Sequence, residues 1–301
     1  MSSSISKKTR KTLTGIAYIS PWIIGFSCFG IIPLVYSFYC SFCQYRLGGQ
    51  PKFLGGTDKG LFYNYVTLFS GTYGDFYVSF KNTFVFTFLT TTLTMIIGLT
   101  FSLIINSVPK LKRFFQTVYY LPGVLPLIAA TMLWEAMFAQ QGILNGIFGL
   151  FGREPIIFMN HKNAMASLIL MSVWGGIGGK ITMLCPTIAS VSTEMLESME
   201  LDGANTFDKI IHAIIPMISP TIFYLLIMDI IGGLQVYAPM MMLGGGTATV
   251  SATLQIYNLT FTDRAVGFAC AYAWVLFVLI LIITILFFRF GGKKVYYADG
   301  D

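Results

Sequence analysis

Three charged side chains lie inside long apolar runs of this sequence, where charge is costly. Asp229 lies near the middle of the run 216–243, whereas Glu135 and Lys180 lie near the ends of the runs 114–137 and 164–184. Ionisable groups in such runs mark ligand pathways, proton relays or paired charges. Glu135 and Lys180 are close enough to the ends of their runs to reach toward water. Asp229 is therefore the main candidate for chemistry within an apolar environment.

A second candidate is the most acidic stretch of the chain, Glu197–Pro216, which separates two of the apolar runs. Ser192 or Thr193 is expected to cap a helix just before this stretch. Met195, Met199 and, less ideally, Leu196 would form an apolar strip on that helix. Asp202 and Gly203 form a turn dipeptide. The first half of the stretch therefore predicts a short amphipathic helix followed by a tight turn.

The second half of the stretch predicts another short helix. Asn205, with Asp208 three residues later, has the spacing of a capping box. Phe207, Ile210, Ile211 and Ile214 follow at helical spacing. Pro216 then lies at or near the first turn of the next apolar helix, where proline is tolerated. The pair of helices would either lie on the membrane surface or insert into a partner protein.

The composition identifies the elements that must position these residues. The chain has 301 residues, of which 55% are hydrophobic and 11% charged, and its mean hydropathy is +0.72. Soluble domains carry about 25% charged residues. The fold expected is therefore an all-α polytopic membrane protein, and its net charge of +6 is a topology signal that implies no nucleic-acid partner.

Six apolar segments are long enough to cross about 30 Å of hydrocarbon, and their approximate ranges are 13–39, 83–108, 114–137, 164–184, 216–243 and 265–288. Lys and Arg are more frequent on the side of the N-terminus, which predicts that both termini are cytoplasmic. The organisation expected is a basic N-terminal segment (1–12), a transmembrane domain (13–289) with a cytoplasmic loop at about 190–215, and a cytoplasmic tail (290–301).

Prolines and glycines interrupt two of these segments. Pro122 and Pro126 lie in the third segment, where proline removes a backbone donor and bends a helix. The fourth contains VWGGIGGK, with four glycines. These glycines allow close helix packing, or they mark a helix that lines a cavity.

The remaining residue types argue against catalysis and metal binding. The five cysteines lie in or beside apolar runs without metal-binding spacing, and the two histidines are far apart. No nucleophile pair or His/Asp/Glu constellation is evident, and no phosphate-binding loop GxxxxGK[ST] is present. We expect no enzyme activity, no metal site and no cofactor bound by this chain.

The acidic stretch resembles the EAA segment of binding-protein-dependent ABC transporter permeases. Its matching residues are Glu197, Asp202, Gly203, Ala204, Phe207, Pro216 and Pro220. Ser198 and Met199 stand where that pattern has two alanines, so the groove that receives the helix should be slightly different. SPWIIGFSCFGIIPLVYSFYCSF, KRFFQTVYYLPGVLPLIAATMLWEAMF and LQVYAPMMMLGGG resemble, in order, spans of maltose-type carbohydrate importers. The resemblance is to the first of their two permease subunits.

The resemblance implies a set of partners. A second permease subunit would complete the pathway through the membrane lipids, and two ATPase subunits, which hold the ATP and Mg, would power it. An extracytoplasmic binding protein would deliver a sugar or oligosaccharide to this complex, which would reside in a bacterial plasma membrane. The residues implied in ATPase coupling are Glu197, Asp202, Gly203, Ala204, Asn205, Phe207 and Pro216.

The resemblance also implies a substrate pathway on the fourth and fifth spans. The residues in that region are Ser172, Trp174, Asp229, Gly233 and Gln235. Carboxylates and amides can hydrogen-bond to sugar hydroxyls, and aromatic faces can pack on sugar rings. The alternative for Asp229 is a structural pair with a polar group on the second permease.

Two other functions remain open. A permease for glycerol phosphate would favour Arg and Lys in its pocket, and the spans offer almost none. A proton-coupled transporter using Asp229 would usually have internal repeats, and no clear inverted repeat is found.

Overall fold

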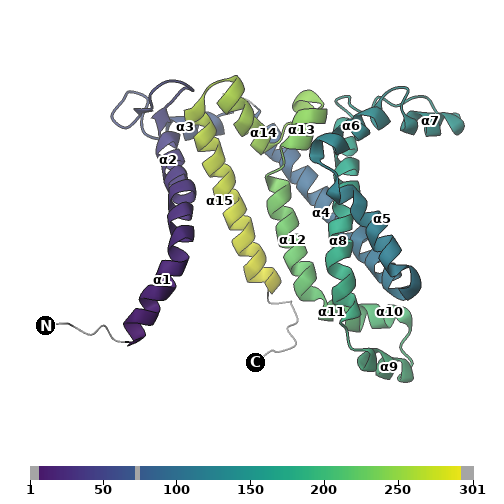
Figure 1. The fold of residues 1–301 in the computed structure, drawn as a ribbon. Helices are drawn as coiled ribbons and strands as arrows, with labels where there is room; N and C mark the ends of the chain where they lie inside the picture. Colours follow the sequence, from purple (N-terminus) through teal and green to yellow (C-terminus); the bar gives the residue numbers. More distant parts are fainter. Residues whose placement is uncertain (1–6, 72–74, 293–301) are drawn as a thin grey trace. The chain divides into compact units, whose positions relative to one another are not determined.

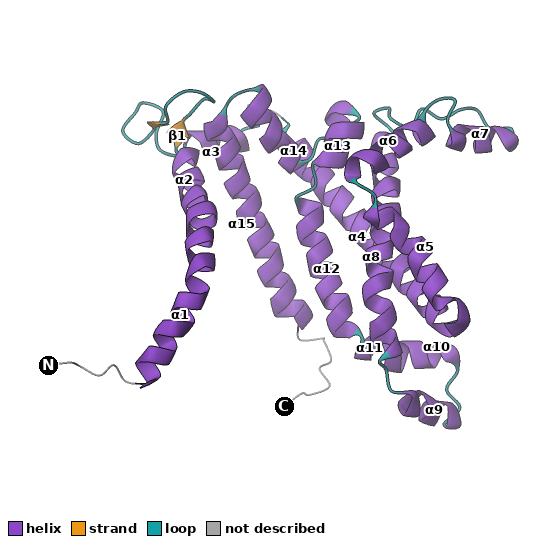
Figure 2. Ribbon diagram, in the orientation of Figure 1, coloured by secondary structure: helices purple, strands orange, loops and turns teal. Residues whose placement is uncertain are grey.

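The computed structural model describes residues 7–71 and 75–292, which divide into two compact units. The first unit comprises Met1–Thr72 and Ile256–Val275, and the second comprises Tyr73–Gln255 and Leu276–Asp301. Helix dominates the described residues (Figure 2). The only strands among them are β1 (Cys43–Gln44) and β2 (Lys52–Phe53), which pair antiparallel in the first unit. Much of the predicted N-terminal segment and of the predicted tail lies outside the described residues.

The first unit is built on α1 (Lys7–Phe26) and α2 (Ile32–Ser41), joined without a break by a π-helical turn, η1 (Ser27–Ile31). The short helix α3 (Tyr63–Phe69) follows the strand pair. Asn64 is buried there and donates hydrogen bonds to the carbonyl oxygens of Ser41 (2.8 Å) and Cys43 (3.0 Å). The unit also contains η5 (Asn258–Thr262) and the first turns of α15 (Val266–Gly291).

Four helices form the core of the second unit: α4 (Phe76–Ser107), α5 (Lys112–Val124), α8 (Ala164–Ala189) and α12 (Ser219–Leu234). α4 packs against α8 and α12, and α5 packs against α8 (Figure 1). Several buried hydroxyls of α4 donate within the helix, as in the bonds from Thr90 to Phe86 and from Thr94 to Thr90, both 2.7 Å, whereas the buried Thr87 hydroxyl has no hydrogen-bond partner among the described residues. Small and hydroxyl residues thus let the helices approach closely at little polar cost.

The glycines of α8 confirm helix packing at two positions. A Cβ atom at Gly178 would overlap the carbonyl oxygen of Tyr119 on α5, and one at Gly176 would lie 3.0 Å from Thr94 on α4. No atom lies within 4 Å of a Cβ built at Gly175 or Gly179. The motif therefore brings α8 close to two neighbouring helices.

We expect Gly178→Ala to separate α5 from α8 and to lower stability by about 1–3 kcal/mol, the usual cost of overpacking. Gly179→Ala is the matched control, because it adds the same methyl group one residue away in open space. Thermal unfolding in detergent, monitored by fluorescence-detected size exclusion, measures the difference. Equal stability of the two variants would contradict a close α5–α8 crossing.

Backbone breaks divide two of the predicted spans. Leu125 and Pro126 are extended and separate α5 from α6 (Leu127–Phe138), as the proline motif predicted, whereas Pro122 remains inside α5. Near the other break, α12 ends at Leu234 and α13 spans Ala238–Leu243. The prediction of one span over 216–243 is therefore wrong in detail, since the helix stops at Gln235.

Several short helices complete the second unit. They are η2 (Pro109–Leu111), α7 (Ile143–Leu150), α9 (Thr193–Leu201), α10 (Thr206–Lys209), η3 (Ile210–Ile214), α11 (Ile215–Met217) and η4 (Gly246–Ala248). The helix α14 (Ala252–Tyr257) lies at the chain boundary between the two units.

Five helical segments within 7–71 and 75–292 are long and apolar enough to cross a membrane, and a bent pair makes a sixth. The five are Thr14–Ser41, Phe76–Ser107, Leu127–Leu150, Ala164–Ala189 and Val266–Gly291, and the pair is Thr206–Met217 with Ser219–Leu234. A multi-span helical membrane protein is thus confirmed. The predicted third span, 114–137, differs because α5 and α6 share it.

Candidate functional site

The segment 192–214 folds into a helical loop at the lower end of α8 in Figure 1. The Ser192 hydroxyl caps α9 by accepting a hydrogen bond from the Met195 amide at 3.3 Å. The Asn205 side chain accepts from the Asp208 amide, and the Asp208 carboxylate accepts from the Asn205 amide, each at 3.0 Å. The predicted cap and capping box are both present, so local sequence determines where the two helices begin.

The turn between α9 and α10 depends on a left-handed glycine. Gly203 has φ +86°, and its amide donates to the Glu200 carbonyl oxygen at 3.0 Å. The Ala204 amide then donates to Met199 at 2.9 Å, which completes a helix C-terminal motif. No atom lies within 4 Å of a Cβ built at Gly203. The requirement for glycine therefore comes from the backbone conformation alone.

An ion pair closes the same turn. Lys209 Nζ lies 2.7 Å from Glu200 Oε2, which joins the end of α10 to the end of α9. The Lys209 ammonium lowers the pKa of the Glu200 carboxyl below its usual value. Since this carboxyl is exposed to solvent, the pair orients the turn more than it stabilises the fold.

The two faces of the loop differ in burial. Met195 and Leu196 of the predicted strip pack on the apolar ends of α8 and α12, whereas Met199 is half-buried and does not belong to that cluster. Leu201 is 89% exposed and Phe207 is 69% exposed, so both project away from the protein. Leu201 was not among the sequence candidates. Its signal was a large apolar residue at the last helical position before the Asp-Gly turn.

The loop continues into α12 through a bent helical path. α10, η3 and α11 follow one another, and the segment Thr206–Met217 meets Ser219–Leu234 at 68°. Pro216 lies in α11, one turn before the start of α12, and Ile218 at the bend is fully buried. Because Ile218 still donates to the Ile214 carbonyl oxygen (3.0 Å), the path is hydrogen-bonded through the bend. The loop and α12 are therefore joined by continuous backbone hydrogen bonding.

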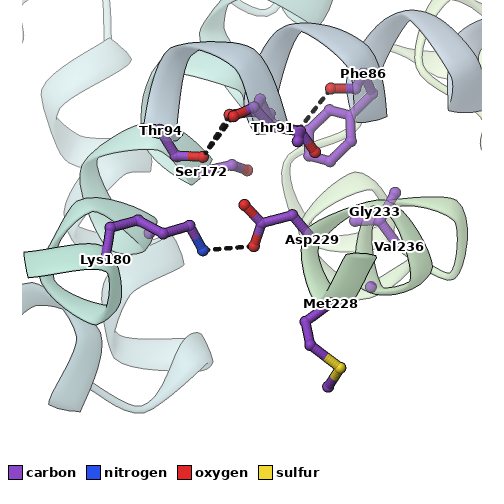
Figure 3. Close-up of a pocket in the computed structure, with 12 residues that line it drawn as sticks. Phe86, Thr91, Thr94, Ser172, Lys180, Met228, Asp229, Gly233 and Val236 are labelled. Atoms are coloured by element: carbon purple, nitrogen blue, oxygen red, sulfur yellow. Dashed lines mark hydrogen bonds and ion pairs between the residues drawn. The ribbon is translucent and has the colours of Figure 1, made fainter. Parts of the chain in front are cut away.

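A pocket of about 270 Å³ lies between α4, α8 and α12 (Figure 3). Its lining is Phe86, Thr90, Thr91 and Thr94 from α4, Ser172, Gly176 and Lys180 from α8, Met228, Asp229, Gly232 and Gly233 from α12, and Val236 from the segment that follows α12. Hydroxyl groups and one oppositely charged pair thus face a space bounded by membrane helices.

Lys180 and Asp229 form the ion pair of this pocket. The Nζ and Oδ1 atoms are 2.5 Å apart, and the two side chains are 10% and 20% exposed. Asp229 Oδ2 is buried and has no hydrogen-bond partner among the described residues. The interpretation that Lys180 reaches toward water is therefore wrong, and Asp229 finds a partner within its own chain. The observation that the spans offer almost no cations also needs correction, because Lys180 is inside the pocket.

The structure divides the predicted pathway residues into two groups. Ser172, Asp229 and Gly233 line the pocket, whereas Trp174 and Gln235 do not. Trp174 packs edge-on against Trp134 with ring centroids 5.7 Å apart, and it lines a second pocket of about 240 Å³. Gln235 is exposed and donates to the Ile231 carbonyl oxygen at 3.2 Å.

The three threonines that α4 contributes to the pocket were not among the residues predicted from the sequence. Thr90, Thr91 and Thr94 recur at helical spacing within an apolar run, and this repeat was the available signal. Their significance depends on which side of α4 faces α8, which only helix packing determines. Among the described residues, no cluster of three or more His, Cys, Asp or Glu side chains could hold a metal ion.

Membrane-spanning helices around a polar pocket, continuous with an exposed helical loop, define the class of this protein as a membrane transport component. The chain belongs to the family described as binding-protein-dependent transport system inner membrane components, whose model matches residues 92–293. This is a family of ABC transporter permease subunits, which are transport components and not enzymes. The resemblance noted from the acidic stretch is thereby confirmed.

Similar proteins extend over nearly the whole chain. The probable ABC transporter permease protein YesP of Bacillus subtilis (strain 168) is 29% identical and covers 98% of this chain and 96% of its own length. The arabinooligosaccharides transport system permease protein AraP of the same organism is 25% identical, and the match covers 92% of this chain and 88% of AraP. A chain in the crystal structure of a bacterial alginate ABC transporter with its periplasmic protein has the same fold, with a TM-score of 0.81 and 22% identity. The match covers 97% of this chain and 99% of that chain.

Proposed function

We propose that this chain is the first of two permease subunits of an ATP-driven importer that takes up a sugar or oligosaccharide. An extracytoplasmic binding protein delivers the cargo, and the complex resides in a bacterial plasma membrane with both termini of this chain in the cytoplasm. Family membership and the relative named for arabinooligosaccharides support this function. The observation that carries it is the hydrogen-bonded path from the exposed loop 192–214 to α12, which lines the polar pocket.

The loop 192–214 is the proposed docking element for one of two ATPase subunits, which hold the ATP and Mg. The docking residues are Glu197, Asp202, Gly203, Ala204, Asn205 and Phe207, with Pro216 at the bend and Leu201 added from the structure. Leu201 and Phe207 are the exposed apolar anchors, and such anchors dominate binding at interfaces. The capped helices and the Glu200–Lys209 pair hold these anchors in one arrangement, which suits a rigid lever.

The pocket is the proposed part of the sugar pathway in this subunit. Asp229 Oδ2 lacks a donor among the described residues, and a sugar hydroxyl supplies one. Lys180 neutralises the carboxylate through Oδ1, so the site favours an uncharged cargo. A phosphate ester, which other relatives are named for transporting, would need a free cation, and the pocket's single ammonium is already paired. Trp174 and Gln235 remain pathway candidates only outside this pocket.

Reconstitution tests the proposal. The chain is purified with its co-expressed neighbours, and uptake into proteoliposomes is measured with and without internal Mg-ATP and with the external binding protein. We expect co-purification of a second permease and an ATPase, and sugar uptake that requires ATP. Uptake by this chain alone, driven by a proton gradient, would overturn the proposal and favour the secondary-transporter alternative. ATP-dependent uptake of glycerol phosphate in preference to sugars would keep the importer and overturn the cargo.

A further inference from the structure

The helix α7 has an apolar stripe on its outer side. Leu150 and Phe151 are 85% and 78% exposed, and Ile143 and Ile147 are also exposed. Ile143, Ile147 and Leu150 recur at i, i+4 and i+7, so they lie along one face of the helix, and Phe151 follows directly after its last residue. No residue of α7 carries a charge. Large apolar patches of this kind mark membrane or protein contact surfaces.

The inner side of α7 is fixed to the second unit by a buried amide. Asn145 is 5% exposed, and its Nδ2 donates to the carbonyl oxygens of Ala139 (3.2 Å) and Ile156 (3.0 Å). Its Oδ1 accepts from the Ile156 amide at 2.8 Å. Leu144 packs against the apolar cluster of the unit. These contacts fix the rotation of α7 about its axis, and the apolar stripe is therefore held on the side that faces away from the second unit.

The helix α7 lies between the end of α6 at Phe138 and the start of α8 at Ala164, at the end of the second unit away from α9 (Figure 1). Residues 139–142 are not helical and interrupt the apolar segment Leu127–Leu150, and α7 runs across the direction of α8 (Figure 1). Arg153 and Glu154 follow directly and are exposed. An apolar face flanked by charges is typical of a helix that lies in the headgroup region.

We propose that α7 lies along the outer membrane surface with the stripe Ile143–Ile147–Leu150–Phe151 inserted among the lipid acyl chains. The exposed apolar side chains of α6, Ile128, Met132 and Leu133, make a neighbouring lipid-facing surface. Lipid covers the stripe permanently, whereas a binding protein that docks and leaves would return four large apolar side chains to water in every cycle. The stripe also offers no charge to steer a soluble partner. The α7 helix therefore anchors this end of the pathway at a fixed depth.

Site-directed labelling tests the depth of α7 in the assembled complex in nanodiscs. Cys28 is exposed, so it is first replaced by serine to keep it from taking up the label. The other cysteines remain, because Cys40, Cys43 and Cys185 are buried and Cys270 is half-buried. A spin label is then attached at Leu150→Cys, with Arg153→Cys as the matched control three residues away. We expect the Leu150 label to collide preferentially with oxygen, which concentrates in lipid, and the Arg153 label with a water-soluble nickel complex. The ratio of the two accessibilities should differ by several-fold between the positions.

Three outcomes would overturn the proposal. Equal nickel accessibility at both positions would place the stripe in water. A Leu150 label shielded from both reagents would indicate that a second permease covers the stripe. A Leu150 label that is accessible to nickel and becomes protected only when the binding protein is added would make α7 a protein-docking surface. None of these outcomes depends on which solute is transported.

Discussion

Replacing Gly203 with valine is expected to uncouple ATP hydrolysis from transport while leaving membrane insertion intact. Gly203 has φ +86°, a conformation that a β-branched residue adopts only with strain. A cost of about 1–3 kcal/mol lowers the population of the native turn by roughly 5–150-fold. Because the exposed turn touches no core cluster, this cost acts on the orientation of Leu201 and Phe207 and not on the membrane helices. Uptake should therefore fall by about fivefold or more.

Gly203→Asn is the matched control for this prediction. Asparagine tolerates the left-handed conformation, and open space surrounds the position. We expect near-normal uptake in the asparagine variant. Proteoliposome uptake and ATPase rates are measured on the same preparations, with expression as the check on insertion. Normal uptake coupled to ATP hydrolysis in the valine variant would contradict the proposed docking role of the turn. Failure of both variants would indicate instead that any side chain at this position collides with the ATPase.

Substitutions that break the Lys180–Asp229 ion pair of the pocket are expected to lower both stability and uptake strongly. Asp229→Ala leaves the Lys180 ammonium buried and unpaired, and Lys180→Ala leaves the Asp229 carboxylate in the same state. Breaking a buried pair from one side costs about 3–5 kcal/mol. We expect both single variants to lose stability, to accumulate poorly and to lose most of their uptake. Thermal unfolding in detergent and quantified membrane expression measure the first two effects.

The double variant Lys180→Met with Asp229→Asn separates a structural role from a ligand role. It removes both charges and keeps side-chain size, so it should recover most of the stability lost by the single variants. If Asp229 accepts a hydrogen bond from sugar, uptake should stay reduced by about tenfold or more, since a charged hydrogen bond is worth about 1.5–3 kcal/mol. Full recovery of uptake together with stability would show that the pair only joins α8 to α12. Unchanged uptake in Asp229→Ala would exclude both roles.

The helical loop 192–214 was determined largely by the sequence itself. Its caps, its capping box and its glycine turn all link residues at most five positions apart. The capped loop could therefore be predicted from its residue types, because it depends on neighbouring residues only. Proline was a weaker guide: the chain breaks at Pro126, whereas Pro122 of the same motif remains inside α5. The broad class of membrane protein followed equally directly from composition.

Only the tertiary structure decided which side chains meet in the pocket. Lys180 and Asp229 are 49 residues apart, and each alone suggested a different role. The pathway residues Trp174 and Gln235 were chosen by position along the chain, but Trp174 packs against Trp134 and Gln235 follows the last residue of α12, so neither lines the pocket of Asp229. The α4 threonines illustrate the reason: α4 is apolar on most sides, so its pattern does not reveal which side faces α8. Rotation and depth are set by small residues such as Gly178, where backbones touch, and those contacts exist only when all the helices are packed together.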